Sequence, residues 1–176
     1  MSRAHFIVLL ATILILSGCQ PAPVINSMSK FTLTSSVFKD QELIPKLYTC
    51  DGADINPPLA ISNVPTAVKS LVLIVDDPDA PGGLWTHWLV WNISPETTKI
   101  AEGSVPTGAV QGTTDFGRAD WGGPCPPSGT HRYQFKLYAL DAELDLPART
   151  KQAGLEAAMV GHIVEQATLT GNYSRG

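Results

Sequence analysis

The sequence has no surplus of positive charge, and this limits the partners that the protein can bind. Its 176 residues include 12 Lys and Arg against 16 Asp and Glu, a formal net charge of −4. A protein that holds the phosphate backbone of nucleic acid needs a broad cationic surface. Hydrophobic residues make up 44% of the chain and charged residues only 16%, which is enough apolar surface for a folded core. We therefore expect a folded domain that does not bind nucleic acid.

The chain also lacks the short motifs of common catalytic sites. It contains no Gly-x-Ser-x-Gly, no phosphate-binding Gly-x-x-x-x-Gly-Lys, no His-Glu-x-x-His and no Cys-x-x-Cys. These motifs place nucleophiles, phosphates or metal ions in defined geometries. Their absence favours a protein that is not an enzyme and that needs no cofactor.

The longest apolar run lies near the N-terminus and is too short to span a membrane as a helix. Residues 6–16 are almost wholly apolar, roughly half of the ~20 residues that a membrane-spanning helix needs. Arg3 precedes this run, and Leu16-Ser17-Gly18-Cys19 ends it. This arrangement is typical of a bacterial lipoprotein signal peptide. A plain secretory signal is the alternative interpretation.

We therefore predict a signal peptide over residues 1–18, removed before Cys19, which then carries lipid on its sulfur and amino group. Several acyl chains together anchor a protein stably, because each buried CH₂ contributes about 0.8 kcal/mol. Residues 19–30 contain Pro, Ser and Asn without apolar periodicity and are expected to form a flexible tether. Gln20 stands where Asp usually marks inner-membrane retention. We expect a lipid-anchored protein of the bacterial cell envelope, in the outer membrane and facing the periplasm.

From residue 31 onward, the sequence has the pattern of short strands separated by turns rich in Pro, Gly and Asp. Strands are strongly indicated over residues 70–77, 86–93 and 131–140, and more weakly over 31–34, 43–48 and 167–169. A helix is predicted to begin near Gly154, because residues recur there at helical spacing. Its predicted apolar face, with a structural histidine, consists of Leu155, Ala158, Met159, His162, Ile163 and Gln166. The pattern favours an antiparallel β fold with one or two helices.

Each strongly indicated strand has polar side chains at one end of an apolar row. Side chains alternate faces along a strand. The predicted rows are Leu71, Leu73, Val75 and Asp77; His87, Leu89, Trp91 and Ile93; and His131, Tyr133, Phe135, Leu137 and Ala139. The short connection over residues 78–85 makes the first two strands an antiparallel pair, which brings Asp77 and His87 to one edge of the sheet. His131 and Tyr133 are expected at the same edge.

This edge is expected to form a pocket with an apolar floor and a polar mouth, the general form of a small-molecule site. In the loop over residues 122–127, Gly123 would let backbone N–H groups approach an anion and Pro124 would fix the loop shape. Two imidazoles, a phenol and N–H groups suit a phosphate or carboxylate, provided that Asp77 orients a histidine or accepts a hydrogen bond. A metal site of an enzyme, formed by Asp77, His87 and His131, is the alternative.

At these residues the sequence closely resembles the phosphatidylethanolamine-binding protein family, also called the Raf kinase inhibitor protein family, and most closely its bacterial branch. The matching segments run in the family's order over nearly the whole chain after residue 30. They are Tyr48-Thr49-Cys50-Asp51-Gly52, Pro57-Pro58-Leu59, Asp77-Pro78-Asp79-Ala80-Pro81, Trp85-Thr86-His87-Trp88, Asp115-Phe116-Gly117, Gly122-Gly123-Pro124-Cys125-Pro126-Pro127 and His131-Arg132-Tyr133.

The resemblance implies a mainly β domain over residues 31–176, with a large antiparallel sheet, a smaller sheet and one or two flanking helices. It also implies an anion pocket contacted by Asp77, His87, Pro124, His131 and Tyr133. We accordingly expect a non-catalytic, membrane-tethered protein that binds a small anion or a phospholipid headgroup. The alternative is an inhibitor or regulator of an envelope protease, a kinase or a host protein, because relatives are named for inhibiting such enzymes.

With Cys19 assigned to lipid, two of the three cysteines remain, Cys50 and Cys125. The resemblance places both in loops near the pocket. Disulfides form and persist in an oxidising compartment. We predict a disulfide between them, with two buried thiols as the alternative.

Overall fold

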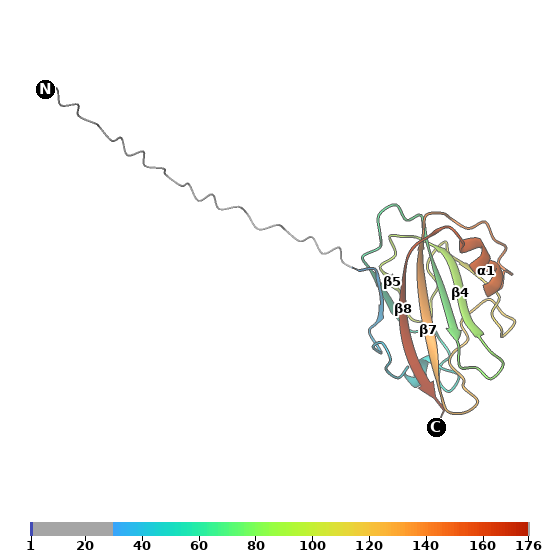
Figure 1. Ribbon diagram of the computed structural model, residues 1–176. Coiled ribbons are helices and arrows are strands. Elements are labelled where there is room, and N and C mark those ends of the chain that lie inside the picture. Colours follow the sequence, from blue (N-terminus) through green and yellow to red (C-terminus); the bar gives the residue numbers. More distant parts are fainter. Residues whose placement is uncertain (2–29, 176) are drawn as a thin grey trace.

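The structure is a computed structural model that describes Met1 and residues 30–175 (Figure 1). The predicted signal peptide, the predicted lipidation site Cys19 and residues 20–29 of the tether lie outside the described residues. Within the described part of the chain, no helix is long and apolar enough to cross a membrane.

Two antiparallel sheets form the fold (Figure 1). The larger sheet has five strands in the order β6-β4-β3-β7-β8, and the smaller has three in the order β1-β2-β5. This arrangement confirms the mainly β fold with a large sheet, a smaller sheet and a flanking helix. The elements are β1 (Thr32–Ser35), η1 (Lys46–Tyr48), β2 (Leu59–Ser62), β3 (Ser70–Asp77), β4 (Trp85–Ile93), β5 (Lys99–Ile100), β6 (Val110–Gln111), β7 (Thr130–Leu140), α1 (Gln152–Met159) and β8 (Ile163–Ser174).

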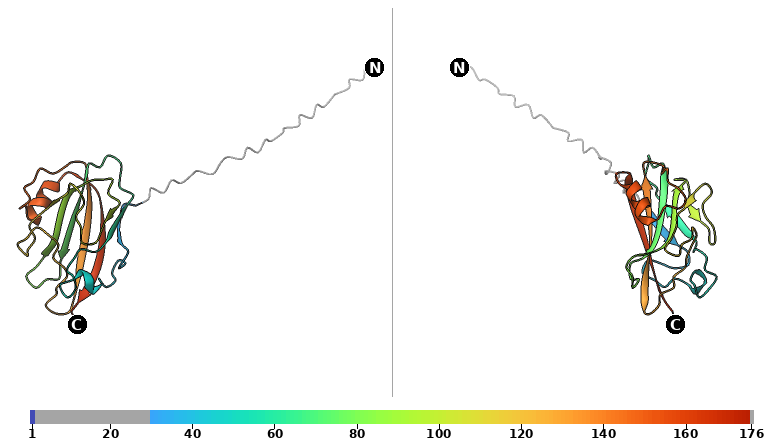
Figure 2. Two further views of the ribbon diagram at one scale, coloured as in Figure 1. Left: turned by 180° about the vertical axis from the view of Figure 1, so that it is seen from behind. Right: turned by 90° about the vertical axis from the view of Figure 1, so that its right-hand side faces the viewer.

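The large sheet lies between the small sheet and α1 (Figure 2). On one face, Val75 and Phe135 pack in a core that includes Ile61 of the small sheet. On the other face, Ile74 packs in a second core with Leu155 of α1. Burial of each large apolar side chain contributes roughly 1.5–3 kcal/mol, so both layers stabilise the sheet.

β3 is the central strand of the large sheet because its residues are suited to burial on both faces. All eight of its residues are buried, and a nearly continuous apolar run is typical of a strand that is covered on both sides. The strands predicted over residues 70–77, 86–93 and 131–140 are confirmed, with β4 and β7 each beginning one residue earlier. The middle of the sheet is therefore well predicted by apolar patterning.

The chain after α1 is a strand, so the prediction of a helix that continues to Gln166 is wrong. α1 ends at Met159, and Gly161 then turns the chain with a φ of 83°, a backbone conformation that glycine adopts without steric cost. β8 begins at Ile163 and runs far beyond the predicted strand over residues 167–169.

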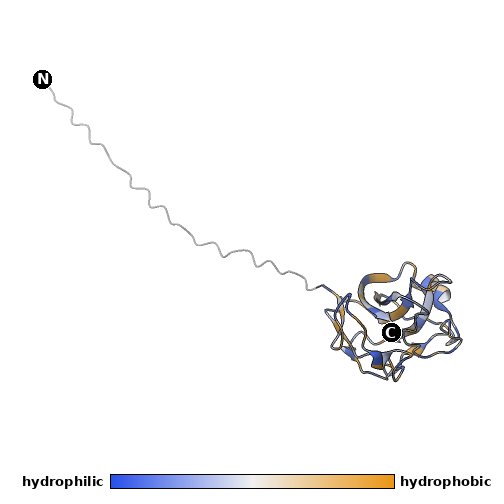
Figure 3. Ribbon diagram, turned by 90° about the horizontal axis from the view of Figure 1, so that it is seen from below, coloured by the Kyte–Doolittle hydropathy of each residue, from blue (hydrophilic) through white to orange (hydrophobic). Residues whose placement is uncertain are grey.

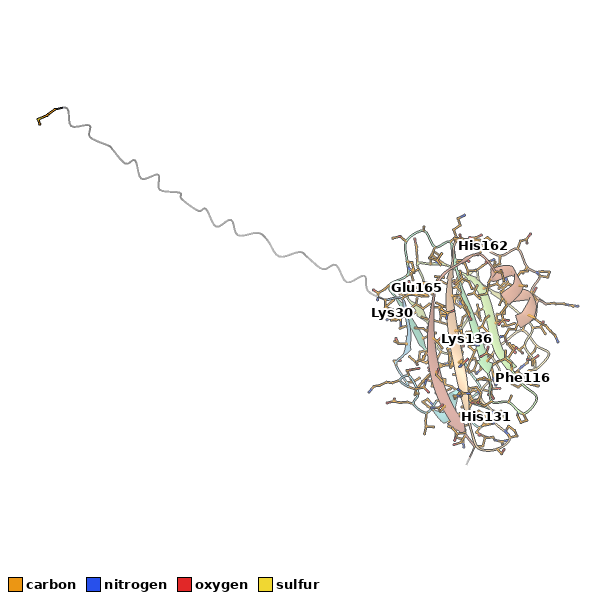
Figure 4. All side chains as sticks on the ribbon, in the orientation of Figure 1. Lys30, Phe116, His131, Lys136, His162 and Glu165 are labelled. Carbon is orange, nitrogen blue, oxygen red and sulfur yellow. A yellow bond between two sulfur atoms is a disulfide. The ribbon has the colours of Figure 1, made fainter. Side chains whose placement is uncertain are left out.

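The expectation for His162 is wrong for the same reason. This residue lies in the exposed turn between α1 and β8, and its Nδ1 atom is 2.8 Å from Oδ1 of Asp141. It does not lie on an apolar helix face. Figure 4 places His162 at the opposite end of the molecule from His131.

The strand predicted over residues 43–48 is also not formed. Leu43 makes only an isolated bridge to Asn172, and Lys46–Tyr48 is a single 3₁₀ turn. Pro45, which precedes this turn, has no N–H to donate to a ladder and has a φ suited to the start of a helix. The proline therefore favours a turn at this position.

Candidate functional site

A cavity of about 320 Å³ opens where β3, β4 and β7 present their polar ends. Figure 4 shows Phe116 and His131 at this end of the molecule. Four of the six predicted ligand-contacting residues line the cavity, together with residues from the loops before β4 and after β6. The lining consists of Asp77, Ala80, Pro81, Trp85, His87, Phe116, Cys125, Pro127, His131 and Tyr133.

A β-bulge in β4 places His87 in this cavity. Val75 of β3 pairs with Trp88, whereas the next residue, Asp76, pairs with Thr86, so His87 is the extra residue. A bulge bends the strand and redirects a side chain. The His87 ring accordingly lies edge-to-face with the Tyr133 ring, with centroids 5.1 Å apart.

The same bulge makes the predicted side-chain row of β4 wrong. Strict alternation would place His87 on one face with Leu89, Trp91 and Ile93. In the structure, Leu89 and Trp91 pack in the core beneath α1, while Ile93 packs in the core beneath the small sheet. A second register shift lies opposite the stretch between Leu71 and Leu73, and it moves Ile93 to the other face.

The tautomer of His87 is fixed by its hydrogen bond. Its Nδ1 atom lies 2.5 Å from the carbonyl oxygen of Gly122. A carbonyl can only accept, so Nδ1 carries the proton and Nε2 of the neutral ring is an acceptor. Burial lowers the pKa of His87, although the Gly122 hydrogen bond and the charge of Asp77 act in the opposite direction. His87 is therefore neutral near pH 7.

Asp77 and His131 form a buried pair across β3 and β7. The Nδ1 atom of His131 lies 2.7 Å from Oδ2 of Asp77, and Oδ1 of Asp77 accepts the backbone N–H of Asp79 at 2.8 Å. Their exposed fractions are 3% for Asp77 and 7% for His131. Because both carboxylate oxygens have donors, Asp77 acts as a support for the His131 ring.

Asp79 lies outside the cavity and binds Arg132, the residue that follows His131 in β7. It accepts two hydrogen bonds from the Arg132 guanidinium and one from the Arg132 backbone N–H. The Arg132 hydrogen bonds lower the pKa of Asp79 to about 2. The turn after β3 is thereby tied to β7 at the residue that follows His131.

The hydroxyl of Tyr133 is buried in the cavity wall and makes no hydrogen bond of normal geometry among residues 30–175, although Asp77 and the backbone of Cys125 lie close enough to influence its pKa. Burial and the nearby charge of Asp77 raise the pKa of Tyr133 well above its ordinary value. The phenol therefore keeps its proton and is a hydrogen-bond donor. A buried polar group without a partner costs about 1–3 kcal/mol, which a suitable ligand atom would relieve.

Gly123 and Pro124, which the sequence also indicated, do not line the cavity. The N–H of Gly123 donates to Oδ1 of Asp54 at 2.6 Å, and the carbonyl oxygen of Pro124 accepts the N–H of Cys50 at 3.2 Å. Both residues are buried behind the wall. The N–H of Gly123 is thus already used, and the expectation that it approaches an anion does not fit the geometry.

The wall itself comes from Cys125 and Pro127 of the same loop. Cys125 forms the predicted disulfide with Cys50, with a Cα–Cα distance of 5.5 Å. The disulfide is thereby confirmed, and it ties the wall to the segment after η1. Two cysteines far apart in the sequence are therefore part of the site's support.

Phe116 is a site residue that the sequence did not single out. Its ring lies edge-to-face with His87, at a centroid distance of 5.3 Å. It is placed by Asp115, which accepts the backbone N–H of Thr86 at 2.8 Å. The only sequence signal was its position within a family-like segment, Asp115-Phe116-Gly117, because no periodicity indicates where a loop side chain points.

No Lys or Arg lines the cavity. Its ionisable side chains are those of Asp77, His87, His131 and Tyr133. Within residues 30–175, no three His, Cys, Asp or Glu side chains are grouped so that they could hold a metal ion. Both oxygens of Asp77 already accept hydrogen bonds, from His131 Nδ1 and from the backbone N–H of Asp79. The geometry therefore gives no support to the alternative of a metal site at Asp77, His87 and His131.

Comparison with known proteins gives concordant matches over most of the chain. The family model for "Phosphatidylethanolamine-binding protein" matches residues 34–174. A UPF0098 protein of Methanothermobacter thermautotrophicus is 51% identical over 150 residues, which cover 82% of this chain and 99% of that protein. UPF0098 protein PH1269 of Pyrococcus horikoshii is 48% identical over 179 residues, covering 96% of this chain and 88% of that protein.

Two solved structures are similar throughout the domain. The crystal structure of CT736 from Chlamydia trachomatis, described as a putative phosphatidylethanolamine-binding protein homologue, has a TM-score of 0.80 and 45% identity. It covers 83% of this chain and 98% of its own. Escherichia coli YbcL, described as a member of the mammalian family, has a TM-score of 0.79 and 34% identity, and covers 84% of this chain and 100% of its own.

Proposed function

The chain belongs to the phosphatidylethanolamine-binding protein family, and from this premise we propose that it is a non-catalytic binding protein for a small anion. The ligand is a phosphate or carboxylate group that occupies the cavity between His87, His131 and Tyr133. Cavities of this size with a few polar groups are typical small-molecule sites.

The observation that carries the proposal is the buried hydroxyl of Tyr133. It is a donor without a partner among the described residues, and it lines the same cavity as the His131 ring that Asp77 supports. An anionic oxygen accepts hydrogen bonds and would satisfy the phenol. This relief favours binding of an acceptor-rich group over binding of an apolar one.

The neutral His87 narrows the ligand class to anions that carry a proton. Its Nε2 atom is an acceptor, so a fully deprotonated anion would face a lone pair at this position. A hydrogen phosphate or a phosphate monoester with one P–OH group can donate to Nε2 of His87 and accept from the Tyr133 hydroxyl, beside the His131 ring. The absence of lysine and arginine from the described lining agrees with a ligand of low charge.

Calorimetric titration with inorganic phosphate, phosphoethanolamine and acetate tests this function. We expect saturable binding of inorganic phosphate or phosphoethanolamine, weakened at least tenfold in Tyr133→Phe, which removes only the hydroxyl; acetate, which carries no proton near pH 7, is the comparison and should bind more weakly. Tyr138→Phe is the matched control, because Tyr138 is on the same strand but packs in the core beneath α1. Absence of binding by all three anions, or equal binding by Tyr133→Phe, would refute the proposal.

We also propose that the protein works at a membrane surface, tethered through lipid on Cys19 after removal of residues 1–18. The support is the short apolar run that ends in Leu16-Ser17-Gly18-Cys19. Mass spectrometry of the mature N-terminus tests this directly. We expect a mature N-terminus at Cys19 that carries a diacylglyceryl group. In Cys19→Ser, both this modification and membrane association should be lost. An unmodified N-terminus at another residue would contradict the proposal.

A further inference from the structure

A second cavity, of about 580 Å³, adjoins the anion cavity across a single residue. It is lined by Lys46, Asp51, Pro127, Ser128, Tyr173 and Arg175. Pro127 also lines the first cavity, so the two share one wall. β8 ends beside this second cavity, and Figure 3 looks onto the end of the molecule where the C-terminus lies.

The second cavity has the cationic side chains that the first one lacks. Both oxygens of Asp51 are engaged, one by the Tyr173 hydroxyl at 2.8 Å and one by Arg175 Nε at 3.3 Å. Within the described part of the chain, Lys46 makes no ion pair. The side chains that line the cavity therefore carry one net positive charge, which is free to attract an anion.

The wall between the two cavities is rigid. Pro127, the residue that lines both cavities, directly follows Pro126, and each of these prolines has a fixed φ. The disulfide joins Cys125 to Cys50, and the residue after Cys50, Asp51, lines the second cavity. The spacing between the two cavities is therefore set by the covalent structure, and a ligand that reaches both meets a preorganised pair of subsites.

We propose that the ligand is elongated and carries two anionic groups, one in the first cavity and one beside Lys46 and Arg175. This inference rests on the proposed function, because it places the first group at Tyr133. It names the ligand class more narrowly: a phosphate monoester or phosphonate with a second anionic group at the other end of a short chain. Charge-assisted hydrogen bonds to Lys46 and Arg175 supply the extra affinity.

Matched ligand series give a direct test. Alkylphosphonates and ω-phosphonocarboxylates of equal chain length differ only in the terminal anionic group. At one optimal length, we expect the ω-phosphonocarboxylate to bind at least tenfold more tightly than its alkyl counterpart. This advantage should shrink as salt is raised, because the second cavity is open to solvent.

Variants separate this inference from the proposed function. Lys46→Ala should remove the advantage of the second anionic group and leave alkylphosphonate affinity unchanged, whereas Tyr133→Phe should weaken both ligand series. Lys99→Ala, an exposed lysine on β5 outside both linings, is the matched control. Equal affinity of the two series at every chain length, with binding of both retained, would overturn the elongated ligand and leave the anion cavity standing. Absence of binding by either series would refute both.

Discussion

Asp77 and His131 are joined across two neighbouring antiparallel strands, with Asp77 Oδ2 2.7 Å from His131 Nδ1. β3 and β7 bring them together at the end of a row of apolar side chains on one face of the sheet, where Val75 lies opposite Phe135. The second oxygen of Asp77 accepts the N–H of Asp79. A carboxylate that would otherwise repel an anion thus serves to orient the ring that receives it.

Asp77→Asn should weaken phosphate binding at least tenfold and lower the free energy of unfolding by about 1–3 kcal/mol, because His131 loses its charged partner in a buried site. Calorimetry and urea unfolding measure the two effects. Asp79→Asn is the control: Asp79 pairs with the exposed Arg132 guanidinium, and exposed pairs contribute only about 0–1 kcal/mol. Unchanged affinity in Asp77→Asn would show that His131 needs no support.

The His87 pKa predicts a loss of stability in mild acid. Burial lowers the pKa of His87 in the folded protein, while the unfolded chain has the ordinary value of about 6.5. The unfolded state therefore binds more protons below that value, so the free energy of unfolding falls as pH drops from 7 to 5. Thermal unfolding of wild type and His87→Asn between pH 7 and 5 measures this loss of stability.

In that experiment, the asparagine keeps a donor for the Gly122 carbonyl but does not titrate. The pH dependence of the variant between 7 and 5 should be shallower than that of wild type. Asp79, whose pKa is lowered to about 2, contributes its own loss only when pH falls through the window from about 4 to 2. Identical curves for both proteins between pH 7 and 5 would contradict a buried neutral His87.

The acceptor at His87 predicts discrimination between anions of the same shape. At pH 7, where His87 is neutral, phosphate still carries at least one proton that it can donate to Nε2, whereas sulfate carries none. We expect phosphate to bind at least tenfold more tightly than sulfate, a difference of about 1.4 kcal/mol. Phosphoethanolamine should likewise bind more tightly than the diester glycerophosphoethanolamine, which has no P–OH group. Competitive calorimetry measures both ratios, and ratios near one would refute the assigned tautomer.

The disulfide predicts a redox-dependent cavity. Reduction of Cys50–Cys125 should destabilise the protein by about 4 kcal/mol in the chain-entropy model, because the cysteines are 75 residues apart. It should also weaken phosphate binding, since Cys125 lines the cavity. Denaturant unfolding with and without reductant measures the first effect. A variant with both cysteines changed to serine should be insensitive to reductant, and two free thiols in the denatured, unreduced protein would contradict the bond.

The sequence is sufficient to predict the centre of the fold and to bring three of the cavity-lining residues to one edge of the sheet. β3 is apolar from Leu71 to Val75. Asp77, His131 and Tyr133 follow from strict alternation on β3 and β7, where pairing is regular through the site. The end of α1 and the start of β8 were not recoverable from spacing. Ile163 continues the helical period of Leu155 and Met159 by coincidence, and only the backbone turn at Gly161 ends it.

Strict alternation along β4 predicts His87 at this edge together with Leu89, Trp91 and Ile93, whereas a bulge places His87 there in the structure. Alternation cannot reveal a bulge, because the extra residue depends on how β4 pairs with β3. Phe116 was missed since its position depends on the hydrogen bond between Asp115 and Thr86, residues that are 29 apart in the chain. Gly123 was misplaced because the use of its N–H by Asp54 is also a long-range contact.

A crystal structure of the protein grown with inorganic phosphate would show whether the cavity binds an anion. We expect a tetrahedral anion in the cavity, within hydrogen-bond distance of the Tyr133 hydroxyl, with its remaining oxygens near His131 and Nε2 of His87. The proposal would be contradicted if, at saturating phosphate, the anion bound elsewhere and the Tyr133 hydroxyl still had no partner.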